Sequence, residues 1–128
     1  MKKILPLILS ALALTACGTS SSKSSYQQLS MDEAIAQMAE EENYILLDVR
    51  TIEEYDDAHI PGAINIANES IGKDEISELS DKHQRIYVYC RSGNRSRQAS
   101  EKLVKLGYTN IVEIGGILDY HGETEQGI

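Results

Sequence analysis

Two apolar runs of strand length constrain the fold of this chain most strongly. Residues 44–49 (YILLDV) form a continuous apolar run, the pattern of a strand buried on both faces of a parallel sheet. Residues 85–89 (RIYVY) form a second β-prone run, and shorter ones lie at 63–66 and 111–114. Because helix-forming stretches separate these runs, the sequence predicts an α/β fold with a mostly parallel central sheet of four or five strands flanked by helices.

Two capping boxes locate the first helices. Ser30 and Thr51 are each followed three residues later by a glutamate, so each pair can satisfy backbone N–H groups that a helix N-terminus leaves unpaired. Gly107 stands where a left-handed residue would end a later helix. The expected helical segments cover residues 31–42, 52–57, 74–79 and 96–106, with a last short one after residue 116.

The N-terminal 25 residues have the composition of an export signal and a linker. Two lysines precede an apolar stretch at 4–14 that is too short to span a bilayer. The residues LTAC, which end at Cys17, resemble the lipobox of bacterial lipoproteins; the alternative is an ordinary cleaved signal followed by an unmodified cysteine. The resemblance implies a signal peptide over 1–16, and a lipidated Cys17 that begins a flexible tether over 17–25. The protein would then be extracytoplasmic and membrane-anchored, facing the periplasm or the cell surface.

Length and charge restrict the mature protein. Cleavage after residue 16 leaves 112 residues, enough for one domain, which we place at 26–128. Lys2 and Lys3 are the only charges removed, so the net charge changes from −8 to −10. Such acidity argues against nucleic acid as a partner. His83 and His121 have no Cys or His at ligand spacing, so we expect no metal. We also expect no cofactor and a monomer.

Cys90 ends the run at 85–89 and is followed by RSGNRS, a short loop with two arginines. Lipidation would consume Cys17 and leave Cys90 as a free thiol. Sulfur at a strand-to-helix junction faces unpaired backbone N–H groups and the positive end of a helix dipole. An ordinary thiol is only about 3% ionised at pH 7, and lowering its pKa by two units requires about 2.7 kcal/mol. Hydrogen bonds to a charged acceptor, at about 1.5–3 kcal/mol each, can supply this. We therefore predict a reactive thiolate; a buried structural cysteine is the alternative.

Four stretches resemble one protein family. CRSGNRS at 90–96 is similar to the active-site loop of single-domain rhodaneses, which are sulfurtransferases. LDVR at 47–50, residues 54–65 and GGI at 115–117 match other signatures of that family. The resemblance covers residues 26–122. It departs at Ala58, where glycine is usual, and at Tyr120, where tryptophan is usual, and we interpret both as packing variation.

The resemblance implies a rhodanese-like fold and sulfur transfer through a persulfide on Cys90. A donor such as thiosulfate would supply the sulfur, and cyanide or a thiol would accept it. A persulfide carrier that delivers sulfur to a protein partner is the alternative. Rhodanese-like phosphatases and arsenate reductases place five residues between cysteine and arginine, whereas four separate Cys90 from Arg95 here. The shorter loop favours sulfur over a tetrahedral oxyanion.

The residues around Cys90 receive expected roles. Arg91 is assigned to sulfonate binding, or is an exposed loop cation; Arg95 binds the donor or braces the loop. Arg50 faces the pocket or pairs with Asp48, and pairing is favoured. The expected substrate-binding residues are Arg50, Arg91, Ser92, Gly93, Asn94, Arg95 and Ser96. The expected structural residues near the site are Asp48, His59, Gly115 and Gly116.

Overall fold

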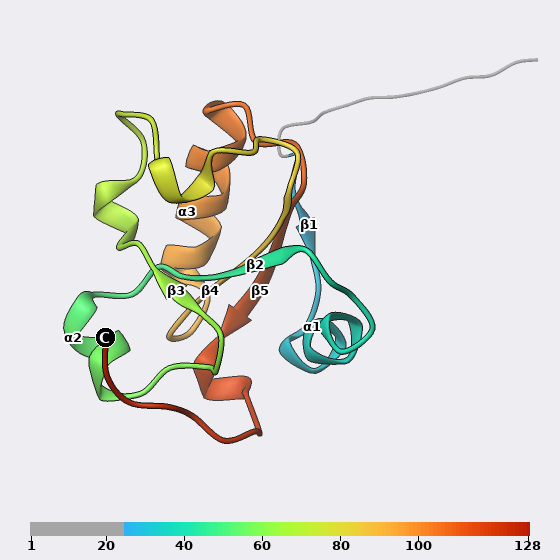
Figure 1. Ribbon diagram of the computed structural model, residues 1–128, viewed down its shortest axis with the longest axis vertical. Helices are drawn as coiled ribbons and strands as arrows, with labels where there is room; N and C mark the ends of the chain where they lie inside the picture. The colour runs from blue at the N-terminus through green and yellow to red at the C-terminus, as the bar shows by residue number, and fades with distance from the viewer. Residues whose placement is uncertain (1–24) are drawn as a thin grey trace, which may run out of the picture.

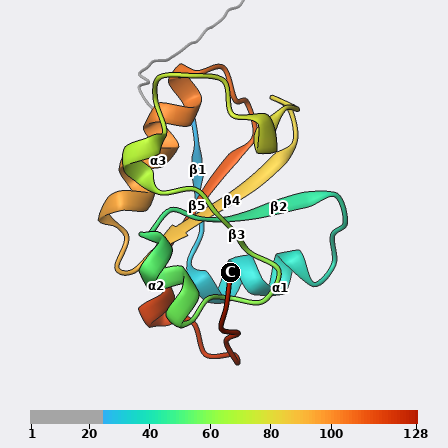
Figure 2. The ribbon, with the colours of Figure 1, turned by 60° about the vertical axis from the view of Figure 1, so that its left-hand side comes forward.

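A computed structural model describes residues 25–128 as a sheet with helices on both faces (Figures 1 and 2). All strand pairs are parallel, in the order β1-β5-β4-β2-β3. The expected signal peptide, the lipidation at Cys17 and the tether up to residue 24 lie outside the described residues. The strands are β1 Gln27–Gln28, β2 Tyr44–Asp48, β3 Ile64–Asn65, β4 Arg85–Cys90 and β5 Ile111–Gly116. The predicted α/β class and parallel sheet are confirmed.

Both capping boxes form as predicted. The Ser30 hydroxyl accepts the Glu33 N–H at 3.1 Å, and the Glu33 carboxylate accepts the Ser30 N–H at 3.1 Å. Thr51 and Glu54 make the same exchange at 3.2 and 3.0 Å. These caps begin α1 and α2. The helices are α1 Met31–Met38, α2 Ile52–Asp57 and α3 Asn94–Lys105, with 3-10 turns η1 Asn68–Ser70, η2 Ser77–Leu79 and η3 Ile117–Asp119.

Helix α1 is shorter than expected: it ends at Met38, whereas the sequence predicted an end near residue 42. The next residues include three consecutive glutamates at 40–42, which the negative end of a helix dipole disfavours. Asn43 then takes a left-handed conformation with φ +63° and turns the chain into β2. The sequence 39–42 also offers no apolar side chain beyond Ala39 to pack on the sheet.

Three further boundaries differ from the expectation. The helix predicted over 74–79 is reduced to the single turn η2. Helix α3 begins at Asn94, two residues early, because Gly93 reaches the left-handed region (φ +117°) and starts the helix at once. Strand β1 was not expected; its two polar residues pair with the edge of β5, which local sequence does not encode.

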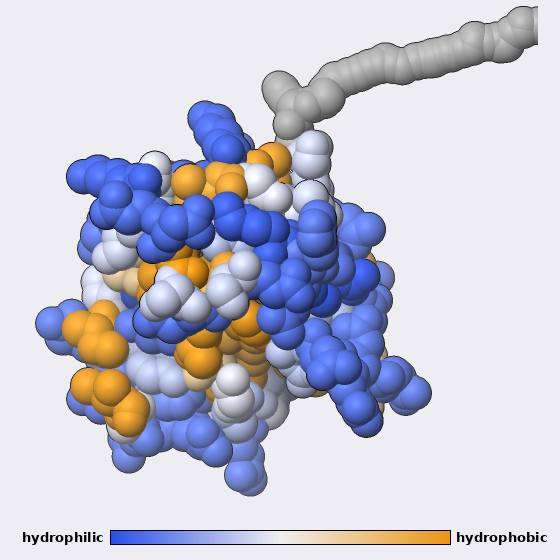
Figure 3. All heavy atoms as spheres, turned by 45° about the horizontal axis from the view of Figure 1, so that its top comes forward, coloured by the Kyte–Doolittle hydropathy of each residue, from blue (hydrophilic) through white to orange (hydrophobic). Residues whose placement is uncertain are grey.

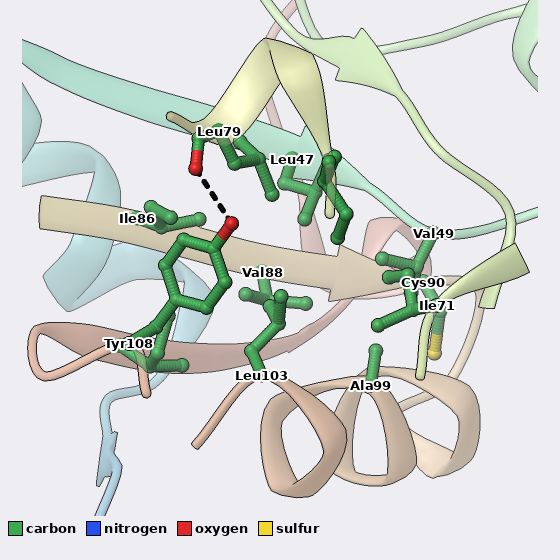
Figure 4. Packing of buried hydrophobic residues seen from close by; sticks show 12 residues of the cluster. Leu47, Val49, Ile71, Leu79, Ile86, Val88, Cys90, Ala99, Leu103 and Tyr108 are labelled. Carbon is green, nitrogen blue, oxygen red and sulfur yellow. Dashed lines mark hydrogen bonds between the residues drawn. The ribbon is translucent and has the colours of Figure 1, made fainter. Parts of the chain in front are cut away.

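The two faces of the sheet carry two apolar clusters. On β4, alternate side chains point to opposite faces, so Ile86, Val88 and Cys90 pack toward α3 while Tyr87 and Tyr89 pack toward α1. Figure 4 shows the α3-side cluster, including the hydrogen bond from the Tyr108 hydroxyl to the Leu79 carbonyl, 2.6 Å long. All five β4 side chains from Ile86 to Cys90 are at most 1% exposed. The central strand is therefore buried on both faces.

The surface is mostly polar, in keeping with the composition. The face in Figure 3 is largely hydrophilic, with apolar side chains in small groups. The large apolar residues with the most exposure are Ile52, Leu118 and Ile128. Within residues 25–128, no helix is long and apolar enough to cross a membrane.

Candidate active site

The sulfur of Cys90 lies at the carboxyl end of the central strand. Cys90 is 1% exposed, and its Sγ accepts a hydrogen bond from the Gly93 N–H at 3.0 Å. Figure 4 shows the thiol at the tip of the β4 arrow, beside Ala99 of α3. Only residues 91–93 separate β4 from α3, so the helix N-terminus faces the sulfur directly.

Helix α3 lacks the side-chain cap that the other two helices have. Its N-cap residue, Gly93, makes no side-chain hydrogen bond, and its first turn carries no acidic residue. The free N–H groups of such a helix end require an acceptor. The Cys90 sulfur supplies one, and an anion on that sulfur is the species best suited to the position.

Hydrogen bonding decides the ionisation of Cys90. Burial raises the pKa of the thiol, but the Ser96 hydroxyl and the backbone amides of Ser96, Gly93 and Ser92 together lower it below its ordinary value. The direction agrees with the thiolate expected from the sequence. The source also agrees, because hydrogen bonds to the sulfur provide the stabilisation.

Ser96 links the sulfur to a buried carboxylate that sequence reasoning missed. The Ser96 Oγ lies 3.5 Å from Cys90 Sγ, 2.9 Å from the Gly93 carbonyl and 2.5 Å from Glu113 Oε2. Glu113 lies within β5 and is 3% exposed. A carboxylate between Ile111 and Ile114 in a buried strand was the signal that could have found it, since buried charges need a specific partner.

Two of the arginines near the loop are held by carboxylates. Arg50 binds both Asp48 oxygens at 2.8–3.1 Å and donates to the Ala58 carbonyl at 2.6 Å. Pairing with Asp48 was the favoured alternative; the guanidinium is 7% exposed, and substrate binding by Arg50 stays a prediction. Arg95 binds Glu54 through two nitrogens at 2.7 and 3.1 Å, which favours the bracing role. Arg91 is exposed.

Close backbone packing fixes the loop from the side of β5. A Cβ on Gly116 would overlap the Arg91 carbonyl and press on Ser92 Cα. The same Arg91 carbonyl accepts the Leu118 N–H at 3.2 Å. Gly115 has φ +85°, which a side chain rarely tolerates. The expected close packing is therefore present at Gly116, whereas a Cβ on Gly115 would meet nothing within 4 Å and glycine is needed there for its backbone conformation.

The other expected structural residues lie near the base of the site. Asp48 is fully buried, and besides Arg50 its carboxylate accepts the Arg50 backbone N–H at 2.9 Å. His59 stacks on Tyr55 with ring centroids 3.8 Å apart, and its Nδ1 lies 2.8 Å from the Tyr55 carbonyl. His59 also pairs with Glu125 through a short antiparallel bridge. In the described part of the chain, no group of three His, Cys, Asp or Glu side chains could hold a metal ion.

The chain is similar to known proteins of one family. A family model described as Rhodanese-like domain matches residues 30–123. The chain is 34% identical over 108 residues to a putative sulfur carrier protein, YrkF, of Bacillus subtilis, covering 84% of this chain and 57% of YrkF. It is 38% identical over 73 residues to thiosulfate sulfurtransferase PspE of Escherichia coli, covering 57% and 70%. A solved rhodanese with anions from Escherichia coli superposes with TM-score 0.60 at 34% identity, covering 66% of this chain and 99% of that one.

Proposed function

Because this chain belongs to the family of rhodanese-like domains, we propose that it is a sulfurtransferase that moves a sulfane sulfur from thiosulfate to a thiol or cyanide through a persulfide on Cys90. The geometry that carries the proposal is the uncapped N-terminus of α3 around a buried sulfur with a lowered pKa. The chain spans just over half of YrkF. The role of YrkF and the activity named for PspE belong to those proteins, and the experiment below tests this chain for the activity.

Loading begins with the Cys90 thiolate. It attacks the outer sulfur of thiosulfate, a new S–S bond forms, and the S–S bond of the donor breaks with its electron pair leaving on sulfite. Arg91, the exposed residue that follows Cys90, would bind the departing sulfonate. The persulfide carries its negative charge on the outer sulfur, and the loop amides stabilise it as fixed dipoles.

In discharge the outer sulfur is again the atom attacked, and Cys90 is now the leaving group. An acceptor thiolate or cyanide attacks that sulfur, the persulfide bond breaks, and its electron pair returns to Cys90 Sγ. The hydrogen bond from Gly93 N–H at 3.0 Å then holds the released thiolate. Stabilisation of the thiolate in this loop makes it a good leaving group.

Intact mass spectrometry tests the proposal. Incubation with thiosulfate is expected to add about 32 Da, one sulfur atom, and cyanide is expected to remove it with release of thiocyanate. Cys90→Ser should abolish both changes although Cys17 remains. If the wild-type protein gains no sulfur from thiosulfate, the proposal is wrong.

The second candidate is a persulfide carrier that delivers sulfur to a protein. Its support is the similarity to YrkF, which is named a putative sulfur carrier protein. A carrier would hold the added sulfur stably and transfer it slowly to cyanide and small thiols. Thiocyanate release at a rate of many turnovers per minute would decide for the enzyme.

We also propose that Cys17 is lipidated and tethers the domain outside the cytoplasm. Support comes from LTAC at the end of an apolar stretch of signal length. Labelling cells with an alkyne-bearing fatty acid should mark the wild-type chain and not Cys17→Ser. Equal labelling of the two would contradict the anchor.

A further inference from the structure

Glu113 is a buried carboxylate without a cationic partner among residues 25–128. It is 3% exposed, and no described Lys, Arg or His lies within ion-pair distance. Its Oε2 accepts the Gly115 N–H at 2.9 Å and its Oε1 accepts from Gln28 at 3.1 Å. An unpaired buried charge is costly, and sharing a proton with a neighbour relieves that cost.

The neighbour that can share a proton is Cys90, through Ser96. A serine hydroxyl has one hydrogen to donate and two lone pairs to accept with. The Ser96 Oγ lies 2.5 Å from Glu113 Oε2 and 3.5 Å from Cys90 Sγ, so the carboxylate is within about 6 Å of the sulfur. At that separation two negative charges disfavour each other.

Two proton arrangements satisfy the contacts of Ser96 with Cys90 and Glu113 without moving a heavy atom, and in both the hydroxyl hydrogen turns away from the Gly93 carbonyl, 2.9 Å from Ser96 Oγ. In one, the Cys90 thiol donates to Ser96 and the Ser96 hydroxyl donates to ionised Glu113. In the other, protonated Glu113 donates to Ser96 and the Ser96 hydroxyl donates to the Cys90 thiolate. If both groups were ionised, the single Ser96 hydrogen could serve only one of them.

We propose that Cys90 and Glu113 hold one proton between them through Ser96. Glu113 is thus a positioning residue that directs the Ser96 hydroxyl and stores the thiol proton. The inference adds a proton store to the proposed sulfur transfer and rests on that function for its purpose. Its test needs no sulfur donor.

The proton balance follows the transfer cycle. Before loading, the thiol proton moves to Ser96 Oγ as the Ser96 hydroxyl proton moves to Glu113 Oε2, which leaves the attacking thiolate. While the outer sulfur is bound, Glu113 remains protonated. After discharge the released sulfur is again a thiolate, and the pair once more holds its one proton through Ser96.

Other charges surround this pair. Glu54 with Arg95 and Asp48 with Arg50 are ion pairs, and the charge of Arg95 also interacts with Cys90. Arg91 is the exposed charge that follows Cys90 in the loop. Tyr26, just before β1, interacts with Glu113 and also with Arg97 and Glu101 on α3. Glu113 lines a hollow of about 330 Å³ together with Asp32, Asp119 and His121.

The test measures thiolate directly. The rate of Cys90 alkylation by iodoacetamide is followed across pH in the full chain, and the mass of the Cys90 peptide excludes signal from Cys17. Coupled groups titrate in two macroscopic steps, so the wild-type profile should rise twice. Glu113→Gln, which keeps the side-chain shape, should give one step and about tenfold faster alkylation near neutrality, because the like charge is gone. Glu101→Gln, an exposed control, should behave as wild type.

Two outcomes of the alkylation experiment overturn the inference. A single titration step in both proteins, with different midpoints in wild type and Glu113→Gln, would show that Glu113 acts on Cys90 only as a like charge and shares no proton with it. Slower alkylation of a folded Glu113→Gln at every pH would show a structural role alone. If that variant does not fold, the wild-type Glu113 carboxyl carbon, followed by NMR, must shift at both steps of the Cys90 profile. Failure of sulfur loading with a two-step profile would reject the proposed function and leave this inference standing.

Discussion

Replacing Glu54 by glutamine should destabilise the protein at neutral pH and have little effect in acid. Glu54 holds Arg95 by two hydrogen bonds, and this pair joins α2 to the first turn of α3, next to Cys90. The hydrogen bond from Arg95, with others from Thr51 and against a cost of burial, lowers the pKa of Glu54 from 4.5 to about 2. Glutamine keeps the capping-box acceptor for Thr51 and removes only the charge.

The size and sign of the effect follow from that pKa. A carboxylate with a lowered pKa in the folded state stabilises the fold fully above pH 4.5, and loses that stabilisation as pH falls toward 2. The whole shift would correspond to about 3.4 kcal/mol. The two side chains are 31% and 29% exposed, so solvent screening reduces the expected value to about 1–2 kcal/mol.

Urea unfolding of wild type and Glu54→Gln at a series of pH values measures this directly. Comparing the two proteins at each pH cancels the titration of other groups. The difference in unfolding free energy should be about 1–2 kcal/mol at pH 7 and close to zero near pH 2. Glu53→Gln, an exposed neighbour in the same helical turn, is the matched control and should show a much smaller difference. A Glu54→Gln effect that does not change with pH would refute the reasoning.

Three other substitutions test the loop and its supports. Gly116→Ala should abolish persulfide formation and lower the unfolding free energy by about 1–3 kcal/mol, because the new methyl overlaps the Arg91 carbonyl. A normal mass gain on incubation with thiosulfate would contradict the role of this close packing. Arg50→Met should cost about 3–5 kcal/mol in urea unfolding, since it leaves the Asp48 charge buried and unpaired; unchanged stability would count against this account. Arg91→Ala should raise the thiosulfate KM about tenfold while the neutral alkylation of Cys90 is unaffected; an unchanged KM would remove Arg91 from donor binding.

Local sequence signals predicted the parts of the fold that depend on neighbours along the chain. The capping boxes at Ser30 and Thr51 and the strand that ends at Cys90 required only residues close in sequence. Strand β1 could not be predicted, because Gln27 and Gln28 are extended only by pairing with β5. The end of α1 depended on like charges at 40–42, a signal that was present in the sequence and not used.

The same distinction between local and long-range contacts applies to the residues of the site. Cys90 and its loop were recognisable because the motif is contiguous, from residue 90 to 96. The roles of Arg50 and Arg95 were ambiguous, because the sequence does not show which carboxylate each guanidinium reaches. Glu113 meets Ser96 from another strand, across 17 residues of chain, so only the folded structure shows that the two belong together.

The packing of Cys90 limits how a reactant can reach it. Its side chain belongs to the same apolar cluster as Val49, Ile71 and Ala99, which close off the sheet side of the sulfur (Figure 4). Displacement at sulfur requires the entering atom, the sulfur under attack and the leaving atom to lie nearly on a straight line. Because Cys90 is 1% exposed, little room is left for the entering atom and the groups attached to it. Slender molecules that carry sulfur at an unbranched tip should therefore react faster than those with a bulky group next to the reacting atom.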